Sequence, residues 1–200
     1  MEIVFIRFAM GALFMGVVFH KEIRRMTKSA VRTGLILGVI GACTFSLEMY
    51  GLAMTEASKA SFLTASNIVM MPFLYTLICK VPLRKWSIVA ACITMVGIGF
   101  LTLQNGVGGI SLGDVLLLLD AVTYCMSNIM VFKLCGEDSR LQITFVRFVT
   151  VAVFMGIFAA IQGFGGTYSG GTWLAMVYLI LVPTVLCFTM QTIAMKYVNP

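Results

Sequence analysis

The sequence is poor in charge and in histidine. Asp, Glu, Lys and Arg together make up only 11% of the 200 residues, while 60% are hydrophobic and the mean hydropathy is +1.01. Because charged residues make up about a quarter of a typical soluble protein, this composition excludes a soluble fold and indicates an integral membrane protein. The net charge of +6 does not indicate a nucleic-acid partner, since the basic residues lie between apolar runs and form no basic face.

Residue patterns for catalysis and metal binding are also missing. The six cysteines are scattered without a CxxC pair, and the single histidine, His20, lies at the end of the first apolar run. The chain has no GxSxG or HExxH motif, and its glycine-rich stretches 106–109 and 163–171 fit no nucleotide-binding pattern. We therefore expect no catalytic residue, no metal and no cofactor.

What the sequence has is a series of long apolar segments joined by short connections. A helix that spans a bilayer needs about 20 mostly apolar residues. Seven segments approach or meet that length: 3–19, 34–54, 60–79, 86–103, 115–132, 141–162 and 172–194. The sequence thus predicts an all-α integral membrane protein with seven transmembrane helices, and residues 1–200 form a single membrane domain.

The basic residues alternate between connections. Eleven of the fourteen lie in loops 20–33, 80–85 and 133–140 or after the seventh segment, whereas the connections between these loops carry almost none. Cytoplasmic loops of membrane proteins carry the excess of Lys and Arg. We therefore expect a multi-pass protein of the cell inner (plasma) membrane with loops 20–33, 80–85 and 133–140 in the cytoplasm.

A twelve-residue stretch occurs twice. Residues 5–16 (FIRFAMGALFMG) and 145–156 (FVRFVTVAVFMG) are identical at seven of twelve positions, and each copy carries one arginine, Arg7 or Arg147. The copies open the first and sixth segments, which are five crossings apart, so they should run antiparallel across the membrane. Inverted repeats of this kind are typical of secondary transporters, and a five-helix period implies a complete bundle of ten helices in a 5+5 arrangement. Each arginine lies one to two turns inside its segment, so we expect its side chain to snorkel to the interface.

Several motifs resemble the EamA-type transporters of the drug/metabolite transporter superfamily. The most specific is residues 57–74, ASKASFLTASNIVMMPFL. Phe-x-Arg-Phe at 5–8 and 145–148, and Gly113-Asp114 followed by Tyr124, also fit the family pattern. One departure is local, because Ile78-Cys79 stand where many members have Gly-Glu.

The resemblance implies a division of the chain. Residues 1–103 would be a partial first repeat with family helices two to five, and residues 104–200 a partial second repeat with helices six to eight. The first, ninth and tenth family helices would then lie outside these 200 residues.

Glu48 is the first candidate for transport chemistry, because acids within membrane spans are rare and usually functional. Thr44 shares its helical face, together with Gly34 and Gly41, so this face is small and polar. A low-dielectric environment favours the neutral form of an acid, which suits a carboxyl group that couples transport to protons. The alternative is a structural acid that is hydrogen-bonded to neighbouring helices.

Asp120 is the second intramembrane acid. Tyr124, Ser127 and Asn128 follow at helical spacing, so all four side chains share one face. Lipid cannot satisfy these groups, and the face should turn toward a cavity or the bundle interior. Two interpretations stay open, a substrate cavity with Asp120 as a second proton-coupling candidate, and interhelical hydrogen bonds that serve packing alone.

The third and seventh segments contain prolines that can interrupt a membrane helix. Thr64 and Asn67 precede Pro72 in the third segment, and Gln191 follows Pro183 in the seventh. Proline removes a backbone hydrogen bond, and transporters use such interruptions near their substrate sites. We take Thr64, Asn67 and Gln191 as further cavity candidates. Prolines of this kind are also common in structural helices.

These observations favour a secondary transporter that moves small metabolites or drug-like solutes, as an exporter, by alternating access through a midplane cavity. Its expected partners are the lipid bilayer, a small-molecule solute and protons. A homodimer, or partner helices that supply the missing spans, would complete the bundle, and the Gly34-x-x-x-Gly38 pair is a close helix contact within or between chains. The alternatives are a non-transporting remnant that packs with other membrane chains and a membrane-embedded enzyme that uses Glu48 and Asp120.

Overall fold

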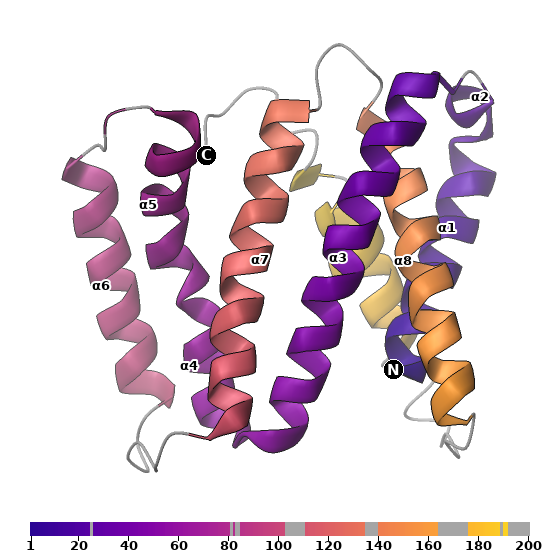
Figure 1. The fold of residues 1–200 in the computed structure, drawn as a ribbon. Helices are drawn as coiled ribbons and strands as arrows, with labels where there is room; N and C mark the ends of the chain where they lie inside the picture. The colour runs from indigo at the N-terminus through magenta and orange to yellow at the C-terminus, as the bar shows by residue number, and fades with distance from the viewer. Residues whose placement is uncertain are drawn as a thin grey trace. The chain divides into compact units, whose positions relative to one another are not determined.

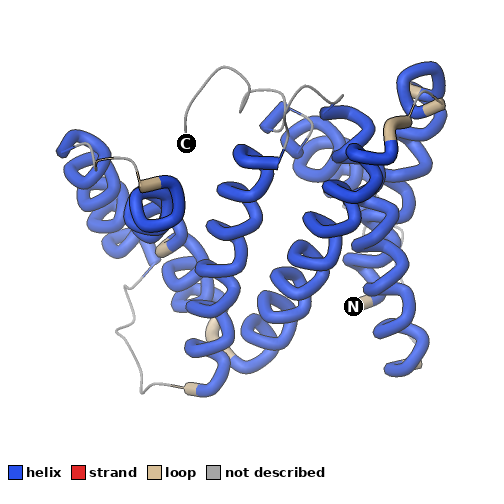
Figure 2. Tube along the Cα trace, turned by 45° about the horizontal axis from the view of Figure 1, so that its top comes forward, coloured by secondary structure: helices blue, strands red, loops and turns tan. Residues whose placement is uncertain are grey.

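The structure, a computed structural model, describes residues 1–24, 26–80, 82, 85–102, 111–134, 140–163, 176–188 and 190–191. Every regular element in these ranges is a helix (Figures 1 and 2). The helices are α1 (Glu2–Val18), α2 (His20–Ile23), α3 (Lys28–Met54), α4 (Ala57–Ala65), α5 (Asn67–Cys79), α6 (Lys85–Thr102), α7 (Leu112–Leu134), α8 (Arg140–Gln162) and a π-helix, η1 (Ile180–Cys187).

Helix is present in each of the seven apolar segments. Four stretches are long and apolar enough to cross a membrane: Lys28–Met54, Ala57–Cys79, Leu112–Leu134 and Arg140–Gln162. Lys85–Gly97 and Met176–Cys187 are shorter apolar helices, and α1 has 17 residues. The all-α membrane class is confirmed, while seven crossings and a ten-helix bundle stay predictions.

The chain divides into two compact units. Unit 1 comprises Met1–Ala42 and Met130–Asn199, and unit 2 comprises Cys43–Ile129. Helices α3 and α7 contribute to both units, because α3 passes from unit 1 to unit 2 and α7 passes from unit 2 to unit 1. Each unit therefore draws residues from both predicted repeats.

In unit 1 the two copies of the repeat pack directly against each other as α1 and α8 (Figure 1). The contacts are reciprocal. A Cβ atom on Gly156 would lie 3.0 Å from Cε2 of Phe5, and one on Gly16 would lie 3.4 Å from Cε2 of Phe145. Phe5 and Phe145 are equivalent in the repeat, as are the two glycines, so the copies run antiparallel around a local two-fold relation.

Burial follows the same relation. Phe8 and Phe148 are both fully buried and meet edge to face at the crossing, with ring centroids 5.4 Å apart. On the outer side, Phe14 and Phe154 are 40% and 39% exposed. These two equivalent pairs thus have equivalent environments, which is what an inverted duplication predicts for the packing of its own two copies.

Helix α3 lies along α8 at a very short distance in unit 1. A Cβ atom on Gly34 would lie 2.6 Å from Cβ of Val146, and one on Gly38 would lie 2.4 Å from Cβ of Thr150. Small residues at this spacing let helix backbones approach closely in membranes. The Gly34-x-x-x-Gly38 pair is therefore used for a contact within the chain.

Unit 2 contains the remaining part of α3, the helices α4 to α6, and most of α7. The third apolar segment is broken at Ser66, whose N–H bonds the carbonyl oxygen of Leu63 at 3.1 Å, and α6 packs against both halves of the segment, α4 and α5. α3 and α7 pack antiparallel, because Gly51 meets Leu117 and Gly113 meets Met54.

Candidate functional site

All the predicted cavity residues except Gln191 belong to unit 2. They come from α3, from the junction of α4 and α5, and from α7: Thr44, Glu48, Thr64, Asn67, Asp120, Tyr124, Ser127 and Asn128. Gln191 belongs to unit 1 and is half-buried. The candidate site is therefore described within unit 2.

The polar face of α7 points into the protein. Asp120, Ser127 and Asn128 are 3%, 1% and 5% exposed, and Tyr124 is half-buried. The opposite face of α7 carries apolar residues such as Leu118 and Leu119, which are exposed. A helix of this composition buries its polar face because lipid offers no hydrogen-bond partners.

The two intramembrane acids interact. The charge of Glu48 on α3 acts on Asp120 on α7, so the two side chains lie within range of an electrostatic interaction. Glu48 is half-buried, and Thr44 one turn earlier on α3 is 4% exposed. The two predicted polar faces, one on α3 and one on α7, thus lie in the same region of unit 2.

Asp120 has an unusual environment for an acid. Within the described residues its Oδ1 atom is buried and has no hydrogen-bond partner. The nearby Thr123 hydroxyl donates to the main-chain carbonyl of Asp120, at 2.9 Å, and not to its carboxyl group. Buried polar atoms in proteins are normally paired, and an exception needs a physical explanation, such as a functional role or a bound water.

The junction of α4 and α5 reaches the same helix. The thiol of Cys125 on α7 donates to the carbonyl oxygen of Asn67, the first residue of α5, at 3.3 Å. Thr64, three residues earlier at the end of α4, is half-buried. α5 continues through Pro72, so the interruption of this segment lies at Ser66, about one and a half turns before the proline.

The second proline lies in an irregular helix of unit 1. Pro183 is inside η1, where the Thr184 hydroxyl donates to the carbonyl oxygen of Leu179, five residues earlier, at 2.8 Å. π-Helical turns occur often at functional sites, and here the wide turn accommodates a proline that has no N–H to donate.

The arginines of the repeat are in places that the sequence did not predict. Arg147 is only 6% exposed, and its guanidinium lies 5.4 Å from the centre of the Phe188 ring, so the expectation that it snorkels was wrong. Arg7 is half-buried, and its Nε donates to the Thr184 hydroxyl. The sequence signal for these environments was that Arg7 and Arg147 occupy equivalent positions in the two copies of the repeat.

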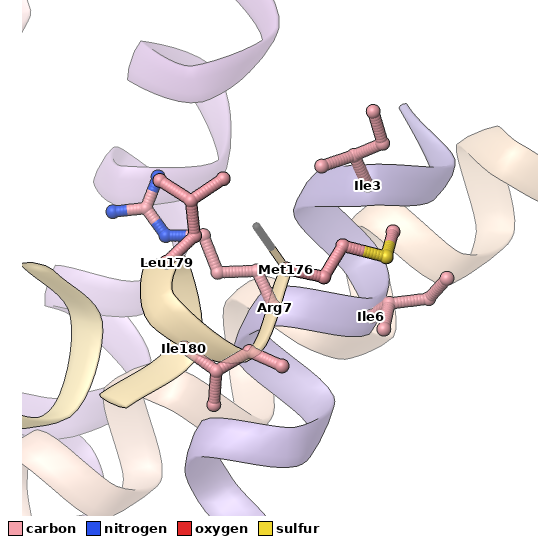
Figure 3. Close-up of a pocket in the computed structure, with 6 residues that line it drawn as sticks. All are labelled: Ile3, Ile6, Arg7, Met176, Leu179 and Ile180. Atoms are coloured by element: carbon pink, nitrogen blue, oxygen red, sulfur yellow. The ribbon is translucent and has the colours of Figure 1, made fainter. Parts of the chain in front are cut away.

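A small apolar depression surrounds Arg7, between α1 and the residues leading into η1 (Figure 3). Figure 3 shows Arg7 and Leu179 among the labelled side chains that line it. The lining residues are Ile3, Ile6, Arg7, Met176, Leu179 and Ile180. Five of these six are aliphatic, so this depression lacks the polar groups of a solute site.

Asp114 near the start of α7 bonds one group from α4 and the residues directly after α3 and directly before α7. Its Oδ2 accepts from the backbone N–H of Ser111 at 2.7 Å and from Lys59 Nζ at 2.6 Å, and its Oδ1 accepts from the Thr55 hydroxyl at 3.3 Å. Lys59 lies on α4, so the ion pair ties the start of α4 to the start of α7. Asp114 is 4% exposed, and both of its carboxyl oxygens accept hydrogen bonds, whereas Oδ1 of Asp120 accepts none within the described residues.

Metal ligation finds no support in the part of the chain that the structure describes, where no group of three or more His, Cys, Asp or Glu side chains is placed to hold an ion. The described chemistry of the site consists of two carboxyl groups, hydroxyls, an amide and a phenol.

Comparison with known proteins identifies a transporter family. The model of the EamA-like transporter family matches residues 1–103 and 111–200. The chain is also 27% identical over 93 residues to a protein of Archaeoglobus fulgidus named "Uncharacterized transporter". That match spans 46% of this chain and 29% of the relative, so the chain matches less than a third of that protein's length.

Proposed function

The chain belongs to the EamA-like transporter family, and we propose that it moves a small solute through a cavity lined by the acids of unit 2. It is a multi-pass membrane protein, and its family and named relative point to a transporter and not to an enzyme. The observation that carries the proposal is the interacting carboxyl pair, Glu48 and Asp120, of which one oxygen is buried without a partner among the described residues.

The chemistry of the pair suits proton coupling. Two carboxylates that lie close together in a low-dielectric region repel each other, so binding a proton to one of them relieves both the repulsion and the cost of burial. Departure of that proton would create charge in the cavity and change its affinity for a solute. Glu48 and Asp120 would therefore act as the coupling groups.

The other polar residues would complete the cavity wall. Ser127 and Asn128 extend the polar face of α7, Thr44 extends that of α3, and the interrupted junction at Asn67 adds backbone polarity. The inverted relation of the two repeat copies, which is the construction used by secondary transporters, supports alternating access. Outward transport is part of the proposal.

The charge of the loops supports an orientation of the protein in the membrane. Loops 20–33, 80–85 and 133–140 would lie in the cytoplasm of an inner-membrane protein, because the excess of Lys and Arg faces inward. The Lys59–Asp114 ion pair would then lie at the opposite, external end of unit 2.

The proposal is tested by proton flux. Purified protein is reconstituted in liposomes that contain a pH-sensitive dye, and small amino acids, amines and carboxylates are added one at a time. We expect at least one solute to drive proton movement in the wild type and Glu48→Gln to abolish it.

The matched control is Glu56→Gln, which removes an exposed acid at the start of α4. It should keep the wild-type flux. A Glu48→Gln protein with unchanged, pH-dependent flux would contradict the role of the pair, and a monodisperse wild type that moves none of the solutes would favour a non-transporting protein.

A further inference from the structure

We infer that one end of unit 1 is a preformed binding surface for the headgroups of anionic phospholipids. Basic residues from four helix ends meet there. They are Lys21 and Arg24 in or next to α2, Lys28 and Arg32 at the start of α3, Lys133 at the end of α7, and Arg140 at the start of α8.

Three of the four helix ends, those of α3, α7 and α8, are held together from beneath. Ala30 and Leu37 of α3, Val131 of α7 and Ile143 of α8 form one buried cluster with Met130 packed against it. The basic side chains lie at the rim above this cluster. All of them are exposed except Arg140, which is half-buried.

The loop between α1 and α3 is fixed by one buried side chain. Gln142 of α8 is 4% exposed, and its Nε2 donates to the carbonyl oxygen of Glu22 at 2.8 Å while its Oε1 accepts from the N–H of Thr27 at 3.4 Å. The Thr27 hydroxyl in turn accepts from the N–H of Ala30 at 3.2 Å, which caps α3. The amide thus clamps both flanks of the turn that carries Arg24.

Orientation of a membrane protein requires basic residues in a loop but does not require the loop to be clamped. A buried amide that bonds two backbone positions costs conformational freedom, and it holds the backbone that carries Lys21, Arg24 and Lys28 in one conformation. One fixed backbone conformation is useful when the surface must match a charged ligand.

The charge of this end is strongly positive. Residues 20–33 and 133–140 contain seven basic and three acidic residues. Glu22 is the acid that the structure describes, and it is exposed, while Arg25, Glu137 and Asp138 lie outside the described residues. An anionic ligand is therefore favoured over a cation or a neutral headgroup.

Apolar surface adjoins the basic rim. Val17 and Val18, directly before α2, are 68% and 52% exposed, and Leu134 is exposed beside Lys133. A ligand with a phosphate and an acyl chain can satisfy both surfaces at once, whereas a free anion uses only the charges. Anionic lipids of the cytoplasmic leaflet have this combination.

Lipid titration tests the inference. The full chain in neutral detergent is titrated with short-chain phosphatidylglycerol or phosphatidylcholine, and binding is followed by native mass spectrometry. The wild type should prefer phosphatidylglycerol. Lys21→Gln/Arg24→Gln should weaken that binding about 25-fold, from roughly fivefold for each charge at a membrane surface.

Two further variants separate the surface from total charge. Lys80→Gln/Lys85→Gln removes the same number of charges elsewhere and should leave phosphatidylglycerol binding unchanged. Gln142→Leu keeps every charge and should weaken binding several-fold through loss of the clamp.

Equal losses of phosphatidylglycerol binding in the Lys21/Arg24 and Lys80/Lys85 variants would overturn the inference. An unchanged preference for phosphatidylglycerol in the Lys21/Arg24 variant would also overturn it. If millimolar inorganic phosphate displaced phosphatidylglycerol as effectively as added lipid does, the surface would be assigned to free anions instead. If Gln142→Leu does not fold, the two charge variants still decide.

Discussion

Units 1 and 2 join their helices by similar means but differ in one buried acid. Both bring helices close together at glycines, at Gly34 and Gly38 of α3 in unit 1 and at Gly51 and Gly113 in unit 2. Both also use polar contacts between helices, such as Gln142 with the carbonyl of Glu22 in unit 1 and Lys59 with Asp114 in unit 2. Unit 2 also contains the unsatisfied carboxyl group of Asp120.

The difference separates two tasks. Close helix packing in a bilayer is stabilising and leaves little room for movement or solute. A buried acid without a partner costs stability and is retained where function needs it. Unit 2 is thus suited to carry the chemistry, while the crossing of the repeat copies in unit 1 is suited to be a scaffold, and the following substitutions test this contrast.

The largest effect is expected at the glycine contact of unit 1. Gly38→Val should destabilise the protein by about 3 kcal/mol, because its Cβ would lie 2.4 Å from Cβ of Thr150. The matched control is Gly97→Val in unit 2, where a Cβ meets no other atom within 4 Å. Thermal unfolding in detergent should separate the two variants, and equal stability would remove the scaffold role of α3 and α8.

A smaller effect is expected at the buried arginine. Arg147→Met and Phe188→Leu should each destabilise, and their double-mutant cycle should give a coupling energy of about 1 kcal/mol, because the guanidinium stacks on the ring. Additive effects in chemical unfolding would show that this stacking contributes nothing.

The ion pair of unit 2 should respond to charge reversal. Lys59→Asp and Asp114→Lys should each lower the melting temperature, by less than Gly38→Val does, and the double variant should recover part of the loss since the attraction is restored. Recovery will be incomplete because Asp114 also accepts from Ser111 and Thr55. A double variant that is worse than both single variants would contradict this account.

The smallest effect is expected at Cys125. Cys125→Ala removes the hydrogen bond to Asn67 and should cost about 0.5 kcal/mol, because a thiol is a weak donor. Stability measured by thermal unfolding checks it. A loss comparable to that of Gly38→Val would contradict the assignment of Cys125 as a weak donor.

Much of the helical framework follows from the sequence, because long apolar runs have few other folds in a bilayer. The burial of Asp120 and of the polar face that it shares with Ser127 and Asn128 also follows, since these polar side chains recur at helical spacing. The interruption at Ser66 did not follow, because the visible signal was Pro72 and the break lies in the preceding turns.

The environment of Arg147 was missed for a different reason. A single helix shows how far a charge lies from its end, and that distance permits snorkelling. Which neighbouring helix offers an aromatic ring depends on packing between residues far apart in the chain, here Arg147 and Phe188. The Glu48–Asp120 interaction could not be predicted from helical periodicity either. Periodicity predicts the polar face of each helix but not which two helices bring their polar faces together.

The most direct test of the contrast is solute-driven proton flux per folded protein in liposomes, compared between Asp120→Asn and Gly38→Ala. Asp120→Asn should keep or raise the melting temperature and lose coupled flux, because it removes a charge that the described structure leaves unpaired at Oδ1. Gly38→Ala should lower the melting temperature and keep the flux. Wild-type coupled flux in Asp120→Asn would contradict the central claim that the acids of unit 2 carry transport.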